Sequence, residues 1–187
     1  NNTSEYLQKL ETLKSDILEE FASVEKDLEI NFATTENIEN GLSVEDSKKI
    51  ILALKSAHNG VYRMSPDVED LVEASNNIAR VELKNGGLKI LNLTRSSVES
   101  TKMAVAEQLK SVFELAGMQV DFSGSYPGWK PKPGAEIIKI MTEIYEKDFG
   151  AKPHVVACHA GLECGIIGAN YPKMEMVSFG PTIKGAH

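Results

Sequence analysis

The chain has 187 residues, of which 42% are hydrophobic and 25% charged, a composition typical of a globular protein with one core or two small ones. Its net charge of −7 argues against nucleic acid as a partner, and its longest apolar runs are too short to cross a membrane. Two cysteines make no disulfide scaffold, which predicts a reducing, cytoplasmic setting. The first residue is not Met and both ends are abrupt, so we expect a fragment of a longer protein.

Residues 4–32 carry the patterns of a helix followed by a strand. Apolar side chains recur at three- and four-residue steps between Tyr6 and Val24, with charged residues on the other face, which predicts an amphipathic helix. Leu28, Ile30 and Phe32 then alternate with polar residues, which predicts a half-buried strand.

A second helix is expected directly after Ser43, a residue type that caps helix N-termini. Its apolar stripe is expected to consist of Ile50, Ile51 and Leu54. Pro66 excludes a regular helix through residues 60–75, so this stretch is expected to form a loop with a short strand.

The clearest local signal is a β-hairpin over residues 75–96. Two alternating runs are joined by Asn85-Gly86-Gly87, residue types that accept the left-handed backbone of a tight hairpin turn. Residues 97–117 predict a long helix that opens at Ser97 and Ser100 and ends at Gly117. Another strand is expected at residues 118–126.

These elements predict an α+β fold in two parts. Residues 1–125 are expected to form a two-layer domain, in which helices cover one face of an antiparallel sheet. Three prolines and three glycines crowd around the single tryptophan at residues 123–135, which indicates a domain crossing. Residues 126–187 predict a helix followed by strands at 154–160 and 174–181, an incomplete α/β piece with a parallel sheet.

The densest group of reactive side chains is Cys158, His159, Glu163 and Cys164. Structural zinc sites usually separate their cysteines by two to four residues and recruit a second pair, which this chain lacks. A catalytic cysteine needs a histidine base close in space, which a sequence does not reveal. We therefore interpret both cysteines as structural, buried at a strand end and in a helix.

Three other residues are candidates for binding. Gly161 follows an expected strand at the start of a short helix, where a ligand could approach the free backbone N–H groups, or where a tight turn simply needs glycine. Arg95, at a strand–helix junction, could bind a carboxylate or pair on the surface with Glu99. His187 follows a glycine loop and could be a metal ligand or a general base, or an exposed terminal side chain without a role.

The motifs "LTRSS", "YPGW", "HAGLECG" and "MVSFGPTIKGAH" resemble, in order and spacing, those of the aminoacyl-histidine (Xaa-His) dipeptidases, M20-family metallopeptidases. The resemblance implies a catalytic α/β domain with two zinc ions and an inserted lid domain of α+β type. Residues 1–125 would belong to the lid, and residues 126–187 to the catalytic domain. It also implies cytoplasmic hydrolysis of dipeptides by a water molecule that the zinc pair activates.

Carried over residue by residue, the resemblance makes His187 a zinc ligand, Arg95 the lid arginine that binds the substrate carboxylate, and Gly161 part of the substrate pocket. The other ligands and the glutamate base of the family have no counterpart here, since no "HTDMV"-like or "EE"-bearing segment is present. We therefore expect these residues alone to bind no zinc pair, to contain no catalytic residue and to be inactive.

Two alternatives stay open from the sequence. One is a deacylase or tripeptidase of the same clan, and the other is a stand-alone α+β binding or dimerisation module. The expected partner is a dipeptide substrate, with neither nucleic acid nor membrane involved. A homodimer through the lid domain is a further hypothesis that the resemblance raises.

Overall fold

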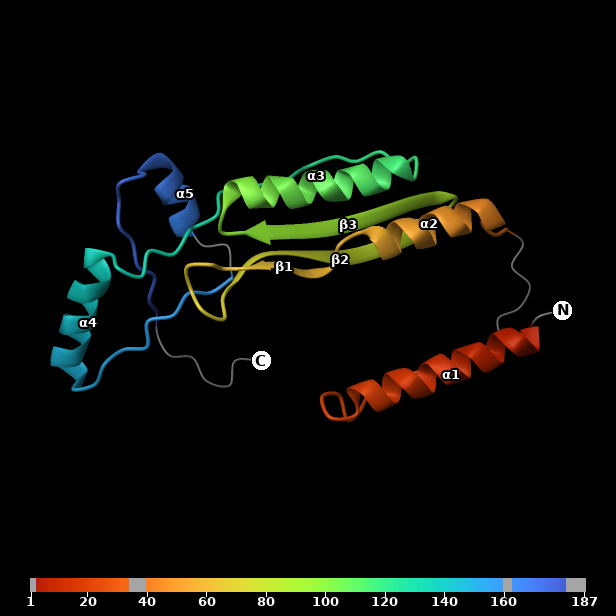
Figure 1. Ribbon diagram of the computed structural model, residues 1–187, viewed down its shortest axis with the longest axis horizontal. Coiled ribbons are helices and arrows are strands. Elements are labelled where there is room, and N and C mark those ends of the chain that lie inside the picture. Colours follow the sequence, from red (N-terminus) through yellow and green to blue (C-terminus); the bar gives the residue numbers. More distant parts are fainter. Residues whose placement is uncertain (1–2, 34–39, 160–162, 181–187) are drawn as a thin grey trace. The chain divides into compact units, whose positions relative to one another are not determined.

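The structure is a computed structural model that describes residues 3–33, 40–159 and 163–180 (Figure 1). The chain divides into two compact units, Asn1–Gly41 and Leu42–His187, and each is described by itself. Gly161 and His187 lie outside the described residues. Among the described residues, every helix is too short or too polar to span a bilayer.

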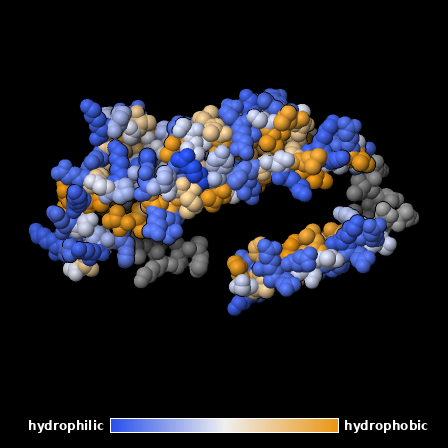
Figure 2. All heavy atoms as spheres, viewed as in Figure 1, coloured by the Kyte–Doolittle hydropathy of each residue, from blue (hydrophilic) through white to orange (hydrophobic). Residues whose placement is uncertain are grey.

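The first unit is built on helix α1 (Thr3–Phe21), which confirms the predicted amphipathic helix. Apolar residues gather along one side of this helix (Figure 2). Tyr6 and Leu13 are among its exposed side chains. The strand expected at residues 28–32 is not formed in this unit. A strand is stabilised by hydrogen bonds to a neighbouring strand, and the described part of the unit contains no second strand to supply them.

The second unit contains an antiparallel sheet of three strands in the order β1 (Gly60–Met64), β2 (Val72–Lys84) and β3 (Gly87–Ser96). Strands β2 and β3 form the predicted hairpin, and β1 lies within residues 60–75, where a loop with a short strand was expected. Asn85 and Gly86 have φ angles of 52° and 75°, so both turn residues are left-handed, the geometry that two-residue hairpins prefer.

Helix α3 (Glu99–Leu115) packs on β2 and β3, helix α2 (Val44–Ser56) packs against α3, and together they make the core of the second unit (Figure 1). The α+β class with helices layered on an antiparallel sheet is thereby confirmed. The predicted stripe of α2 was partly wrong, because Ile51 is 56% exposed. Small residues face the core instead, and they let α2 approach α3 closely. The core cluster consists of Ala53, Ala57, Val105, Leu109 and Phe113.

The helix ends follow the sequence signals with one exception. Ser43 caps α2, since its Oγ accepts the backbone N–H of Asp46 at 3.0 Å. Gly117, with φ at 80°, ends α3, and the next N–H, from Met118, reaches back to the carbonyl of Phe113. The start of α3 differs from the prediction, because Val98 is the N-cap and no side chain caps the helix there.

The last part of the second unit contains helices α4 (Glu136–Phe149) and α5 (Glu163–Asn170). The strands expected at 118–126, at 154–160 and at 174–181 are absent from the described parts of those segments, so the predicted parallel sheet does not form there. The described sheet consists of β1, β2 and β3 and pairs none of these segments with a strand. The domain boundary between residues 125 and 126 stays a prediction.

Candidate functional site

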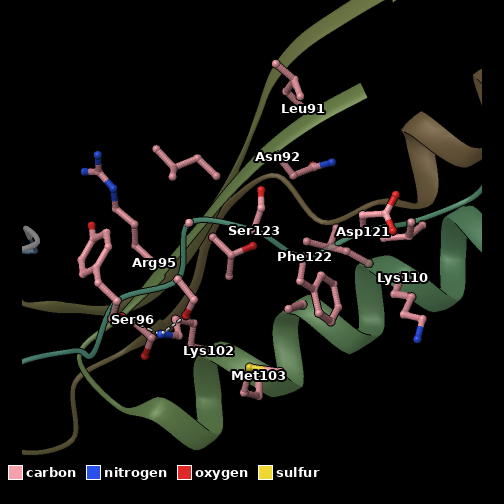
Figure 3. A pocket seen from close by; sticks show the side chains of 18 of the residues that line it. Leu91, Asn92, Arg95, Ser96, Lys102, Met103, Lys110, Asp121, Phe122 and Ser123 are labelled. Carbon is pink, nitrogen blue, oxygen red and sulfur yellow. Dashed lines mark hydrogen bonds between the residues drawn. The ribbon is translucent and has the colours of Figure 1, made fainter. Parts of the chain in front are cut away.

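A cavity of about 650 Å³ lies in the second unit, between β3, α3 and residues 118–126 (Figure 3). Strand β3 is an edge strand of the sheet, so the cavity opens beside its free edge. Apolar side chains from all three elements line it, among them Leu93, Met103 and Phe122. Arg95, Cys158 and His159 line the same cavity and bring polar groups into it.

Arg95 is the last residue but one of β3, at the end away from the hairpin turn, and it lies directly opposite Ser75 of β2. The two side chains therefore project from the same face of the sheet. The alternative pairing of Arg95 with Glu99 is not formed, because the Glu99 carboxylate pairs with Lys102 Nζ at 2.9 Å. Arg95 is exposed and is one of the residues that line the cavity, and within the described residues its guanidinium takes part in no salt bridge. A guanidinium in such a place can bind an anionic ligand.

His159 also lines the cavity, although its sequence pattern predicted no binding role for it. Its Nε2 lies 2.7 Å from the Oγ of Ser75, a contact between residues 84 positions apart. Burial lowers the pKa of His159 below 6.5, the nearby charge of Arg95 lowers it further, and a backbone hydrogen bond at Val72 opposes the shift. The imidazole is therefore largely neutral at pH 7. The only sequence signal was its place in the "CHAGLEC" stretch.

Two glycines hold the motif segments in close backbone contact. A Cβ at Gly128 would lie 2.5 Å from the carbonyl oxygen of Ser96 and 2.9 Å from Cα of Ser97. A Cβ at Gly165 would clash with the carbonyl oxygen of Pro127. The segment "YPGW" thus packs against "LTRSS" through Gly128 and against "HAGLECG" through Gly165. None of the motifs, taken alone, indicated these contacts.

Polar anchors fix the elements around this packing. The buried carboxylate of Glu73 binds Arg63 Nη2 at 2.8 Å and accepts the hydroxyl of Thr101 at 3.1 Å, which ties β2 to β1 and α3. Lys102 Nζ donates to Ser125 Oγ at 3.0 Å and to the carbonyl of Tyr126 at 2.7 Å. These bonds hold residues 125–126 against the start of α3, and all three residues line the cavity.

The cysteines form no metal centre with their described neighbours. Within residues 3–33, 40–159 and 163–180, no three His, Cys, Asp or Glu side chains come together as metal ligands would. Both cysteines are free, and Cys164 is half-buried in α5. The expectation that Cys158 is buried was wrong, because the segment that carries it has no strand partner and leaves the thiol exposed.

No family profile matches the chain. It is 36% identical over 168 residues to the cytosol non-specific dipeptidase of Escherichia coli (strain K12), covering 90% of this chain and 35% of that protein. Among solved structures, it resembles the crystal structure of aminoacylhistidine dipeptidase from Vibrio alginolyticus, with a TM-score of 0.84 and 39% identity. That match covers 98% of this chain and 37% of the other.

These findings confirm the resemblance to aminoacyl-histidine dipeptidases that the motifs indicated. The chain spans only about a third of the length of the relatives it matches. The roles predicted for Arg95, Gly161 and His187 stay predictions, since no ligand or metal contact of these residues is described.

Proposed function

We propose that this chain is part of a cytosolic zinc-dependent dipeptidase that hydrolyses Xaa-His and other dipeptides. The observation that carries the proposal is the match to an aminoacylhistidine dipeptidase over 98% of the chain at a TM-score of 0.84. The cytosolic setting rests on the name of the Escherichia coli relative, a cytosol non-specific dipeptidase. A dipeptide is the proposed partner, and a homodimer through residues 1–125 stays a prediction.

In this proposal Arg95 binds the free carboxylate of the dipeptide. A guanidinium presents two parallel N–H donors that match the two oxygens of a carboxylate, which fixes the orientation of the ligand as well as its position. The cavity volume of about 650 Å³ is within the usual range for small-molecule sites. Its apolar walls would accept the hydrocarbon part of a side chain, while Gly161 would let the substrate backbone approach.

The described residues do not by themselves fit a zinc pair, because they bring no three metal-ligating side chains together. When bound, such a pair would supply a water molecule that is acidic enough to act as a nucleophile near neutral pH. We propose His187 as one ligand, with the remaining ligands and the general base outside these 187 residues. The 187 residues alone would then be inactive.

The test is hydrolysis by the full-length protein of a panel of Xaa-His dipeptides, tripeptides and N-acyl amino acids. The proposal predicts that dipeptides are cleaved best, that a chelator abolishes cleavage and that zinc restores it. His187→Ala should lose activity, whereas His154→Ala, a matched change at an exposed histidine, should keep it. Preference for tripeptides or acylated amino acids would favour the other activities of the clan. No hydrolysis at all would favour a binding module.

A further inference from the structure

We propose that His159 is a second binding residue for the anionic group that Arg95 binds, and that its imidazole takes up a proton when this group arrives. The inference deepens the proposed function and rests on it for the identity of the ligand as a dipeptide carboxylate. The two side chains come from segments far apart in the sequence, and both line the cavity beside β3.

Ser75 is the residue that places the two groups together. It stands opposite Arg95 in the β2–β3 register, and its Oγ lies 2.7 Å from Nε2 of His159. A serine hydroxyl donates to a neutral ring nitrogen and accepts from a protonated one. Ser75 can therefore hold the imidazole in the same orientation before and after it gains a proton.

Within the described residues, the one charged side chain that shifts the pKa of His159 is the cation Arg95. Arg95 belongs to β3, and β2 contributes the Ser75 hydroxyl and a backbone hydrogen bond at Val72. Cys158, also at the cavity, is the neighbouring titratable group on the same segment.

Four other titratable side chains line the cavity, on α3 and on residues 118–126, and three of them have partners of their own. Lys102 of α3 pairs with Glu99, and Lys110 lies 4.0 Å from Glu114. Asp121 accepts a hydrogen bond from the Gln119 side chain at 3.2 Å. Tyr126 also lines the cavity. Within the described part of the chain, no carboxylate contributes to the titration of His159.

Proton uptake follows from this arrangement. Arg95 and burial both disfavour a charged imidazole in the free site, so the ring is mostly neutral at pH 7. A bound carboxylate offsets the charge of Arg95 and attracts a second positive charge, so the ring gains one proton from solvent. Because binding and protonation are linked, the carboxylate binds more tightly as the pH falls from 7 through the range in which His159 titrates.

The direct test is an NMR titration of the histidine rings in the full-length protein, treated with a chelator so that dipeptides are not cleaved. The His159 signal is identified by its loss in His159→Gln. We expect it to titrate below 6.5 in the free protein and at higher pH when acetate or an Xaa-His dipeptide is present. Arg95→Gln should raise the pKa of His159 in the free protein, because it removes the positive charge that lowers this pKa. An unchanged His159 titration with both probes would overturn the inference.

Kinetics give a second readout that separates this inference from the proposed function. In wild type, KM for a dipeptide should fall as the pH is lowered from 7. His159→Gln should remove that trend and raise KM at low pH about tenfold, the change that a difference of about one unit between the pKa of the ring in the free and in the bound site would give, with kcat nearly unchanged. The control is His154→Gln. An unaltered pH trend in His159→Gln refutes the inference while leaving the dipeptidase intact. If no dipeptide is cleaved, the proposed function fails. The NMR titration with acetate then still decides whether His159 gains a proton when an anion binds.

Discussion

Gly128 offers the sharpest test of how the site is held together. Replacing it with alanine puts a Cβ 2.5 Å from the Ser96 carbonyl oxygen and 2.8 Å from the Ser97 carbonyl carbon. These are backbone atoms, so no side chain can rotate out of the way and one of the two segments must move. Overpacking of this kind typically costs about 1–3 kcal/mol. We expect a loss of stability at or above the top of that range, since the contact is with main chain.

The assay is urea unfolding of the full-length protein, followed by circular dichroism, together with KM for a dipeptide. The matched control is Gly134→Ala, because a Cβ at Gly134 meets open space. Gly128→Ala should lower the unfolding midpoint and raise KM, since Ser96 adjoins Arg95 in β3. If Gly128→Ala unfolds at the same urea concentration as Gly134→Ala, the tight packing of the two motifs is refuted.

Three further predictions concern the groups that support the site. Glu73→Ala should destabilise the protein by about 2 kcal/mol in urea unfolding, because it leaves Thr101 and the half-exposed Arg63 without their buried partner. Asn76→Ala should cost about 2–3 kcal/mol by the same measurement, since this side chain is 2% exposed and fully hydrogen-bonded; an unchanged midpoint would contradict either prediction. The pKa of His159 is lower in the folded than in the unfolded chain, so its neutral form favours folding above pH 6.5 and this contribution is lost as the pH falls through the folded pKa. Unfolding midpoints measured between pH 8 and 5 should show this loss in wild type and a smaller one in His159→Gln.

Local signals predicted the elements that local chemistry determines. The Asn85-Gly86 turn sets the hairpin because its left-handed backbone needs no distant partner. Ser43 sets the start of α2 in the same way, through a bond to an N–H three residues on. The helices at 44–56 and 99–115 follow the spacing of their apolar residues.

Local sequence patterns did not predict the features that depend on residues far apart in the chain. The alternating residues at 28–32 have a strand pattern, but a pattern does not supply the neighbouring strand that a ladder requires. The contact of Ser75 with His159 joins residues 84 positions apart. The choice between a carboxylate-binding Arg95 and an Arg95–Glu99 pair also depended on a third residue, Lys102, which takes the Glu99 carboxylate.

The measurement that tests the central claim most directly is kcat/KM of the full-length protein for an Xaa-His dipeptide and for its C-terminal amide, in wild type and in Arg95→Ala. The matched control is Arg80→Ala, an exposed arginine of the same sheet whose partner is Glu82. Removing one charged hydrogen-bonding partner should lower kcat/KM for the dipeptide about 10- to 100-fold. The amide, which lacks the carboxylate, should be a poor substrate for wild type and for Arg95→Ala alike, so Arg95→Ala should lower kcat/KM for the amide only slightly. Equal losses for dipeptide and amide, or none for either, would contradict the assignment of Arg95 to the substrate carboxylate.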